Sequence, residues 1–312
     1  MTQLKINFDK IMNKSKRFDA PVTIMQKKGS GAVKADHHIH MVLDGVDWRS
    51  AIGRHTDGVD QNWVHKTLAR YRDAGYTYLR DGGDRWGVCA YARKVAPDYG
   101  ITYRTPLAPI CRQGHYGGFI GIQYENLRDY VNQIERHRQD GADFIKLMIS
   151  GLMDFDRYGV LSEPGLDGHE IKELIHIAHQ EGFGVMAHAN GARTVEAAAA
   201  AGVDSVEHGA YLDTDALHAM REAGTVWVPT LSTVGNLRGK GRFDENAVAQ
   251  ILESAFENVA AFVQMGGLVA AGTDAGAWAV PHGCGTEEAY LASAGVDGDT
   301  LAAAAQALQT KF

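Results

Sequence analysis

The sequence predicts an α/β fold in which eight parallel strands alternate with helices and close into a (β/α)₈ TIM barrel. Three observations support this prediction. Short apolar segments alternate with longer amphipathic ones, most of the helical segments end at a glycine, and polar residues gather where the apolar segments end. An open doubly wound sheet is the alternative architecture, but no GxGxxG motif follows the first strand.

The expected elements follow one another regularly along the chain. We expect strands at 31–40, 76–81, 101–110, 142–149, 183–188, 203–207, 225–230 and 268–273. Helices are expected at 62–73, 84–96, 123–139, 168–181, 191–201, 214–223, 245–265, 286–294 and 299–310. No linker interrupts the pattern, so we expect one barrel domain over residues 31–312, preceded by an N-terminal extension over residues 1–30.

Composition narrows the class of protein. The chain has 312 residues, of which 45% are hydrophobic and 22% charged, which is typical of a globular protein with a large core. A net charge of -7 and the absence of a basic stripe disfavour a nucleic-acid partner. Neither a signal peptide nor an apolar segment long enough for a membrane is apparent. Three widely spaced cysteines fit reduced thiols, so we expect a cytoplasmic protein.

The first predicted strand carries a histidine pair. Because side chains alternate along a strand, His38 and His40 leave the same face about 7 Å apart and can bind one cation. A chance pair on a surface strand is the alternative. Further metal-binding residue types at the ends of later strands would favour the metal site over a chance pair, because a barrel brings its strand ends together. The later strands end near Lys146, His188, His208 and Asp274, so the sequence predicts a metal site.

These residues resemble those of the metal-dependent amidohydrolase superfamily. The Asp-x-His-x-His and Gly-Thr-Asp-Ala-Gly motifs are general features of that superfamily, while the lysine strand resembles its binuclear, carboxylated-lysine subtype. The segments 144–151, 201–209 and 223–231 most resemble the prolidase and Xaa-Pro dipeptidase branch. Relatives usually carry a small β-sandwich built from both termini, and we expect it to be reduced or absent here.

The resemblance implies two divalent metal ions. His38, His40 and Asp274 would hold the more buried ion and His188 and His208 the more exposed one, with carboxylated Lys146 as the bridge. Burial lowers the pKa of a lysine and leaves a neutral amine that can take up CO₂ as a carbamate. The alternative is an unmodified Lys146 paired with Asp274. Zn²⁺ is the metal that the imidazoles favour, with Mn²⁺, Fe²⁺ and Co²⁺ as alternatives.

The implied activity is hydrolysis of an amide bond of a small-molecule substrate, a peptide or an N-acyl amino acid, by a hydroxide that bridges the metals. Asp274 would pass the proton to the leaving amine. A lactonase or phosphotriesterase would use the same ligands. A deaminase or imidazolonepropionase-like enzyme, or a non-catalytic metal-binding barrel, is a further alternative. The resemblance also allows a homo-oligomer.

Substrate contacts are expected in the loops that follow the strands. His115 matches the position of a Gly-Gly-His-Gly loop and would contact a substrate carboxylate or an oxyanion. Arg112 is the second candidate for the carboxylate, and Tyr158 and His282 are weaker candidates. Many relatives have a second histidine at the position of Asn190. Any substrate contact that this histidine makes in the relatives is therefore in doubt here.

Overall fold

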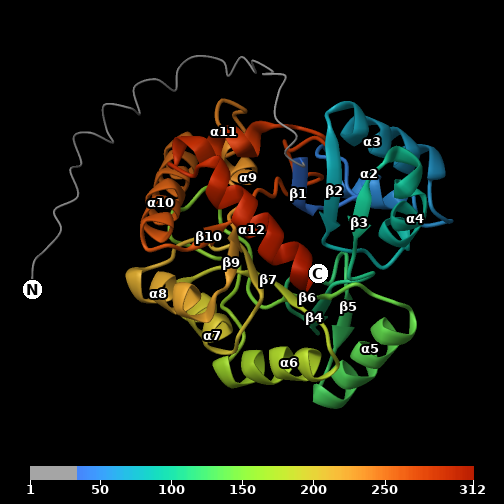
Figure 1. The fold of residues 1–312 in the computed structure, drawn as a ribbon, viewed down its shortest axis with the longest axis horizontal. Coiled ribbons are helices and arrows are strands. Elements are labelled where there is room, and N and C mark those ends of the chain that lie inside the picture. The colour runs from blue at the N-terminus through green and yellow to red at the C-terminus, as the bar shows by residue number, and fades with distance from the viewer. Residues whose placement is uncertain (1–33) are drawn as a thin grey trace, which may run out of the picture. The chain divides into compact units, whose positions relative to one another are not determined.

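The strands of the protein form two parallel sheets. The computed structural model describes residues 34–312, so the predicted extension 1–30 lies outside the described residues. The strand order is β1-β2-β3 in one sheet and β10-β9-β8-β7-β6-β4-β5 in the other, and every pairing between these strands is parallel. Helices lie around the outside of the strands (Figure 1). The predicted α/β class is therefore confirmed.

The strands are short, and most coincide with predicted ones. They are β1 Lys34–Ile39, β2 Tyr76–Asp81, β3 Thr102–Arg104, β4 Ile110–Arg112, β5 Ile122–Tyr124, β6 Ile145–Met148, β7 Val185–Ala189, β8 Ser205–His208, β9 Val226–Val228 and β10 Leu268–Val269. Strands β6, β7 and β9 are buried at every position, as expected for parallel strands covered on both faces.

The helices connect successive strands. They are α2 Trp48–Gly53, α3 Gln61–Asp73, α4 Val88–Val95, α5 Leu127–Gln139, α6 Gly168–Gln180, α7 Ala192–Ala200, α8 Thr214–Ala223, α9 Ser232–Gly235, α10 Glu245–Gln264, α11 Thr286–Ser293 and α12 Gly298–Lys311, with a 3₁₀ turn at Ala96–Tyr99. Aspartate or asparagine side chains cap the N-termini of α2, α3, α5, α6, α8, α10 and α12. No helix of residues 34–312 is long and apolar enough to cross a membrane.

The predicted third strand is interrupted. Between β3 and β4 the chain contains Pro106 and Pro109, which donate no backbone hydrogen bond, and Leu107 has a positive φ of 66°. The predicted helix 123–139 begins only at Leu127, because Ile122–Tyr124 pairs with β4. Helix α2 forms between the predicted strand 31–40 and the predicted helix 62–73, where the sequence predicts neither a helix nor a strand.

Backbone hydrogen bonds also connect the two sheets. His37 N donates to Ala271 O at 2.9 Å, and Asp274 N donates to His38 O at 2.7 Å, so the chain after β10 lies beside β1. At the other edge, Asp143 N donates to Thr105 O at 3.0 Å. These bonds place His38 and Asp274, from opposite ends of the described chain, next to each other.

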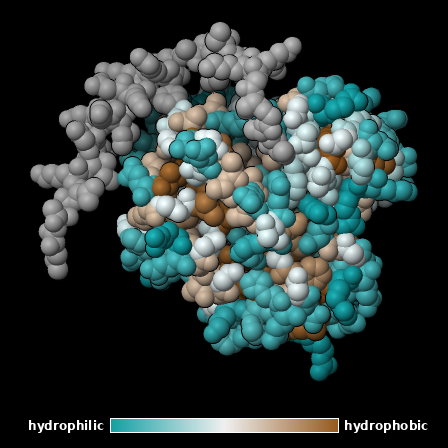
Figure 2. All heavy atoms as spheres, in the orientation of Figure 1, coloured by the Kyte–Doolittle hydropathy of each residue, from teal (hydrophilic) through white to brown (hydrophobic). Residues whose placement is uncertain are grey.

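Helix α12 packs beneath the amino ends of the strands. Phe312, which follows α12, contacts Phe144 edge-on with ring centroids 5.1 Å apart, and Phe144 directly precedes β6. The polar residues of the candidate site lie at the opposite, carboxyl ends of the strands. Figure 2 shows mainly hydrophilic residues over the outer helices on the viewed face, with apolar residues between them.

Candidate metal centre

Two histidines and one aspartate converge at the carboxyl ends of β1 and β10. His38 Nε2 lies 3.4 Å from His40 Nε2 and 3.6 Å from Asp274 Oδ1, and His40 Nε2 lies 3.4 Å from the same oxygen. These three atoms form a nearly equilateral triangle. Ligands about 2.0–2.1 Å from a tetrahedral ion lie about 3.4 Å from one another. The triangle therefore has the size that one such cation needs.

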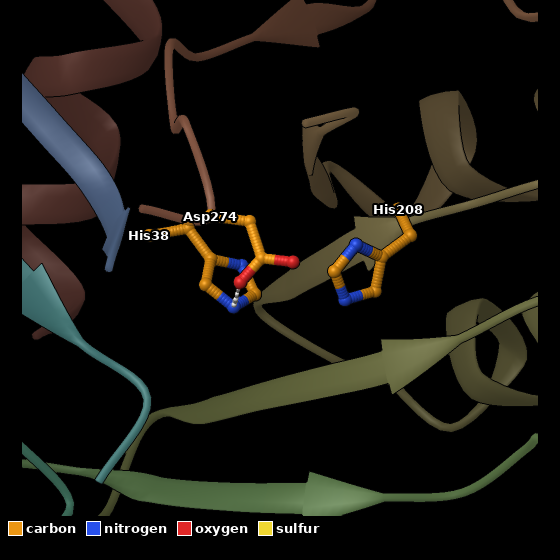
Figure 3. A group of neighbouring side chains, drawn as sticks. All are labelled: His38, His208 and Asp274. Carbon is orange, nitrogen blue, oxygen red and sulfur yellow. Dashed lines mark ion pairs between the residues drawn. The ribbon is translucent and has the colours of Figure 1, made fainter. Parts of the chain in front are cut away.

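His208 extends this group on the other side. Ligand atoms of His38, His208 and Asp274 all lie within 4.8 Å of one another, and Figure 3 shows the three side chains gathered around a common space. The His208 ring also lies 4.6 Å, centroid to centroid, from that of His188. Side chains from β1, β7, β8 and the segment after β10 thus share one centre.

Hydrogen bonds on the far side of the rings fix which nitrogen faces the centre. His38 Nδ1 lies 2.7 Å from Glu207 Oε2, and His208 Nδ1 lies 2.7 Å from Thr230 Oγ1. We assign the proton of His38 to Nδ1 from this carboxylate partner, so its Nε2 carries the lone pair. His188 Nε2 lies 3.2 Å from Gly151 O, which leaves the lone pair of that ring on Nδ1. Each arrangement suits a neutral metal ligand.

A buried ion pair holds Glu207. Arg80 Nη2 donates to Glu207 Oε1 at 2.8 Å, and Ser205 Oγ donates to the same oxygen at 2.6 Å. The side chains of Arg80 and Glu207 are completely buried. Since a lone buried charge is costly, this pairing keeps Glu207 ionised behind His38.

Lys146 is buried beside the histidines without a hydrogen-bond partner. Its side chain comes from β6, only 1% of the residue is exposed, and no acceptor within residues 34–312 bonds its Nζ. The alternative of an unmodified lysine requires an ion pair between Lys146 and Asp274. The described chain has no such pair within 4.0 Å. Burial lowers the pKa of Lys146. Within the described residues, neither the Lys146 amine nor Asp274 Oδ1 has a hydrogen-bond partner, so both are atoms that a bound group would satisfy.

The charges around the centre favour neutral imidazoles. Burial, followed by the positive charge of Lys146, lowers the pKa of His40 to about 3 and that of His188 to about 3. The same two causes hold the pKa of His38 well below its usual range. Burial raises the pKa of Asp274. Neutral imidazoles are the form that binds metals, so the residues fit a cation centre.

The backbone is strained where the ligands leave the strands. His208 and Asp274 have positive φ angles of 67° and 56°, and Thr230, the partner of His208, has 49°. Such conformations cost non-glycine residues about 1–3 kcal/mol each and cluster at functional sites. Close packing adds to this constraint, since a Cβ added at Gly82 would lie 2.9 Å from His40 Nδ1.

Asp36, the first residue of the Asp-x-His-x-His motif, connects the two ends of the centre. Its Oδ2 accepts a hydrogen bond from Thr273 Oγ1 at 2.6 Å, and its Oδ1 accepts one from Thr273 N at 2.8 Å. Asp36 thereby holds the residue before Asp274 against the strand that carries His38. Asp36 therefore fixes the positions of two candidate ligands, His38 and Asp274, relative to each other.

The predicted substrate residues lie in different surroundings. His115 is partly exposed, with its Nδ1 3.5 Å from Glu163 Oε1. Arg112 is exposed on β4, and its Nη1 donates to Glu170 Oε2 at 2.7 Å, so its guanidinium already has a carboxylate partner in α6. Tyr158 is 48% exposed and contacts Tyr211 edge-on.

His282 and Asn190 have their polar atoms engaged within the protein. His282 is buried, its Nε2 donates to Leu43 O at 2.9 Å, and its Nδ1 lies 3.0 Å from Tyr71 Oη. Neither nitrogen of His282 is free for a substrate. Asn190 Nδ2 donates to Gly151 O at 3.0 Å, and its Oδ1 accepts from Ala210 N at 2.9 Å. Asn190 therefore connects the segments that follow β6 and β8.

Sequence reasoning missed the residues that support the ligands. Arg80 and Glu207 are charged residues inside predicted strands, which is a signal of a buried pair, but their separation of 127 positions hides the partnership. Tyr116 was also missed, and its ring lies 4.8 Å from that of His188. Glu163 accepts a hydrogen bond from Tyr116 N at 2.6 Å. No spacing rule points to these contacts.

Comparison with known proteins places the chain in a family. The model of the amidohydrolase family matches residues 92–310. The fold is similar to that of a Xaa-Pro dipeptidase with bound methionine, with a TM-score of 0.71 and 21% identity over 89% of this chain and 75% of that one. Ochratoxinase of A. niger gives a TM-score of 0.71 with 20% identity over 88% and 70%. A prolidase complexed with N-methylphosphonate-L-proline gives 0.62 with 21% identity over 82% and 70%.

Curated relatives match a shorter part of the chain. Uncharacterized proteins of Mycobacterium tuberculosis and Mycobacterium bovis are 35% identical over 119 residues, which is 36% of this chain and 32% of theirs. The chain thus spans about a third of the length of the curated relatives it matches.

The chain belongs to the amidohydrolase family. Its structural neighbours include prolidase-like members, as the sequence motifs indicate.

Proposed function

We propose that the protein is a binuclear metal-dependent hydrolase that cleaves an amide bond of a small peptide or N-acyl amino acid. The triangle of His38 Nε2, His40 Nε2 and Asp274 Oδ1, with sides of 3.4–3.6 Å, is the observation that carries the proposal. In this proposal the sheets close into a (β/α)₈ barrel over residues 31–312, and the ligands occupy its carboxyl end. The names of the dipeptidase and prolidase neighbours support an amide substrate.

The residues divide into two sets of ligands. His38, His40 and Asp274 would hold one ion, His188 and His208 the other, and carboxylated Lys146 would contribute to both. Two bound cations supply Lewis acidity toward a substrate carbonyl and lower the pKa of water, with Zn²⁺ favoured by the imidazole-rich set.

The remaining chemistry belongs to side chains of the chain itself. Asp274 is the carboxylate at the centre and the candidate to accept a proton and pass it to the leaving amine. A carboxylate that lies at the centre and next to the reacting groups can serve as a general base and then as a general acid. Glu207 keeps the His38 lone pair on Nε2 through its bond to Nδ1. Tyr116 covers one face of His188 and limits the access of bulk water from that side.

The test is a substrate screen of the full chain loaded with zinc in bicarbonate buffer. Dipeptides, N-acyl amino acids and lactones would be compared before and after chelation. The proposal predicts chelator-sensitive release of free amino groups from dipeptides or N-acyl amino acids. Turnover of lactones alone, or amide cleavage that survives complete metal removal, would refute it.

A further inference from the structure

An aromatic strip leads from the candidate metal centre to the surface. It consists of Tyr116, Phe119 and Trp48. The Tyr116 ring lies 4.8 Å from His188 and 5.8 Å from Phe119, and the Phe119 ring lies 5.4 Å from Trp48, all between ring centroids. Its outer end is open, because Trp48 is 42% exposed and neighbouring Val46 is 72% exposed. Three contacts in sequence thus connect a proposed ligand with an exposed apolar surface.

Both segments of the strip follow strands that carry or adjoin site residues. Trp48 begins α2, after the strand that carries His38, while Tyr116 and Phe119 lie between β4 and β5. Loops at the carboxyl ends of barrel strands are where substrate is bound. A substrate side chain that lies on Phe119 and Tyr116 is therefore close to the amide bond that is cleaved at the candidate metal centre.

The inner part of the strip is held in place. Tyr116 N donates to Glu163 Oε1 at 2.6 Å, and Ile120 N donates to Gly117 O at 3.0 Å. Gly117 has a φ of 108°, and a Cβ added there would lie 2.7 Å from Met148 Cγ at the end of β6. The loop has no room to shift toward β6, so its rings form a preorganised surface.

Two guanidinium groups flank the strip without a carboxylate partner. Arg49 lies over the Trp48 ring at 4.3 Å, and Arg85 Nη1 donates to Gly118 O at 3.3 Å. Within residues 34–312, neither forms an ion pair, whereas Arg112 is already paired with Glu170. A ligand that combines an aromatic ring with a carboxylate would use both features.

We infer that the aromatic strip is a specificity subsite and that the substrate is an N-acyl amino acid with an aromatic side chain and a free carboxylate. This inference rests on the proposed function. In this inference Arg85, rather than Arg112, binds the carboxylate of the substrate.

The test compares substrates that differ only in the side chain. The zinc-loaded full chain is given N-acetyl-L-phenylalanine and N-acetyl-L-alanine, and kcat/KM is measured for each. We expect a preference for phenylalanine of about tenfold or more, since one well-fitted apolar group gives discrimination of roughly 10–200-fold. Phe119→Ala and Trp48→Ala should each reduce this preference. Arg85→Met should lower kcat/KM for N-acetyl-L-phenylalanine about tenfold or more and leave N-acetyl-L-phenylalaninamide unchanged.

Val131→Ala is the matched control, because Val131 is 45% exposed on α5, outside the strip, and it should keep the wild-type preference. Equal use of the two substrates by the wild type, or an unchanged preference in both strip variants, would overturn the inference. The inference would also be overturned if Trp48→Ala dissociated a dimer in sedimentation experiments and had no effect on the substrate preference.

Calorimetry separates this inference from the proposed function. Binding of free L-phenylalanine and L-alanine is measured on the same zinc-loaded proteins, without turnover. Tighter binding of phenylalanine, lost in Phe119→Ala, supports the strip even if no amide is cleaved. Equal binding of the two amino acids contradicts the strip even if amides are cleaved.

Discussion

The variant Glu207→Gln tests the proposed role of His38 as a metal ligand that Glu207 keeps in the right protonation state. In the wild type, Glu207 accepts hydrogen bonds from His38 Nδ1, Arg80 and Ser205. Glutamine has one oxygen and one amide nitrogen. With its oxygen toward Arg80 and Ser205, its NH₂ group faces His38 Nδ1. The ring then carries its proton on Nε2, which points at the metal triangle, and loses its ligand lone pair.

The structure sets the expected magnitude. Loss of an outer hydrogen-bond partner of a ligating histidine typically lowers metal affinity about 10–100-fold. Arg80 also loses the one carboxylate that pairs with it among residues 34–312, in a fully buried position, and such a broken pair costs about 3–5 kcal/mol of stability. Metal affinity and stability should therefore both fall.

The assay is a competitive chelator titration for zinc affinity, combined with urea unfolding of the metal-free protein. Glu287→Gln is the matched control. Glu287 is also a buried carboxylate, but it accepts hydrogen bonds from Leu231 N and Ser232 N rather than from a ligand. Wild-type zinc affinity in Glu207→Gln, or an equal loss in both variants, would refute the reasoning about His38.

Three further predictions follow from single contacts. Gly82→Ala should weaken zinc binding measured by the same titration, because its Cβ would meet the His40 ring; unchanged affinity would show that the ring moves freely. Asp274→Asn should keep metal by elemental analysis but lose about 10²–10⁴-fold in kcat, and near-wild-type turnover would contradict its proton-transfer role. Burial raises the pKa of Glu287 to about 8, so its contribution to stability is complete below about pH 4.5 and is lost as pH rises toward 8. Glu287→Gln should remove that part of the pH dependence in urea unfolding, and an unchanged slope would argue against it.

Much of the fold follows from the local sequence. Strand β2 and helix α8 lie where the pattern predicts them. A glycine that ends a helix marks the start of β2 and the end of α8, and apolar periodicity identifies the type of each element. The third strand is less predictable, since Pro106 and Pro109 interrupt a segment whose composition is typical of a strand. Helix α2 has only six residues, too few to show a period.

The candidate ligands were predictable because strand ends are recognisable and imidazole, amine and carboxylate groups stand there. Their supports were not, because Glu207 acquires its role only through distant Arg80 and His38. The same limit explains Arg112. Its chemistry suits a carboxylate, but the start of α6 brings Glu170 to it, and no local pattern shows that contact.

Metal stoichiometry tests the central claim most directly. The full chain, exchanged into zinc and bicarbonate and freed of loose ions, would be examined by elemental analysis. The proposed function predicts about two zinc ions per chain, with fewer when His188 and His208 are both replaced by alanine. A chain that retains no zinc, or whose zinc content is indifferent to those replacements, would contradict the account.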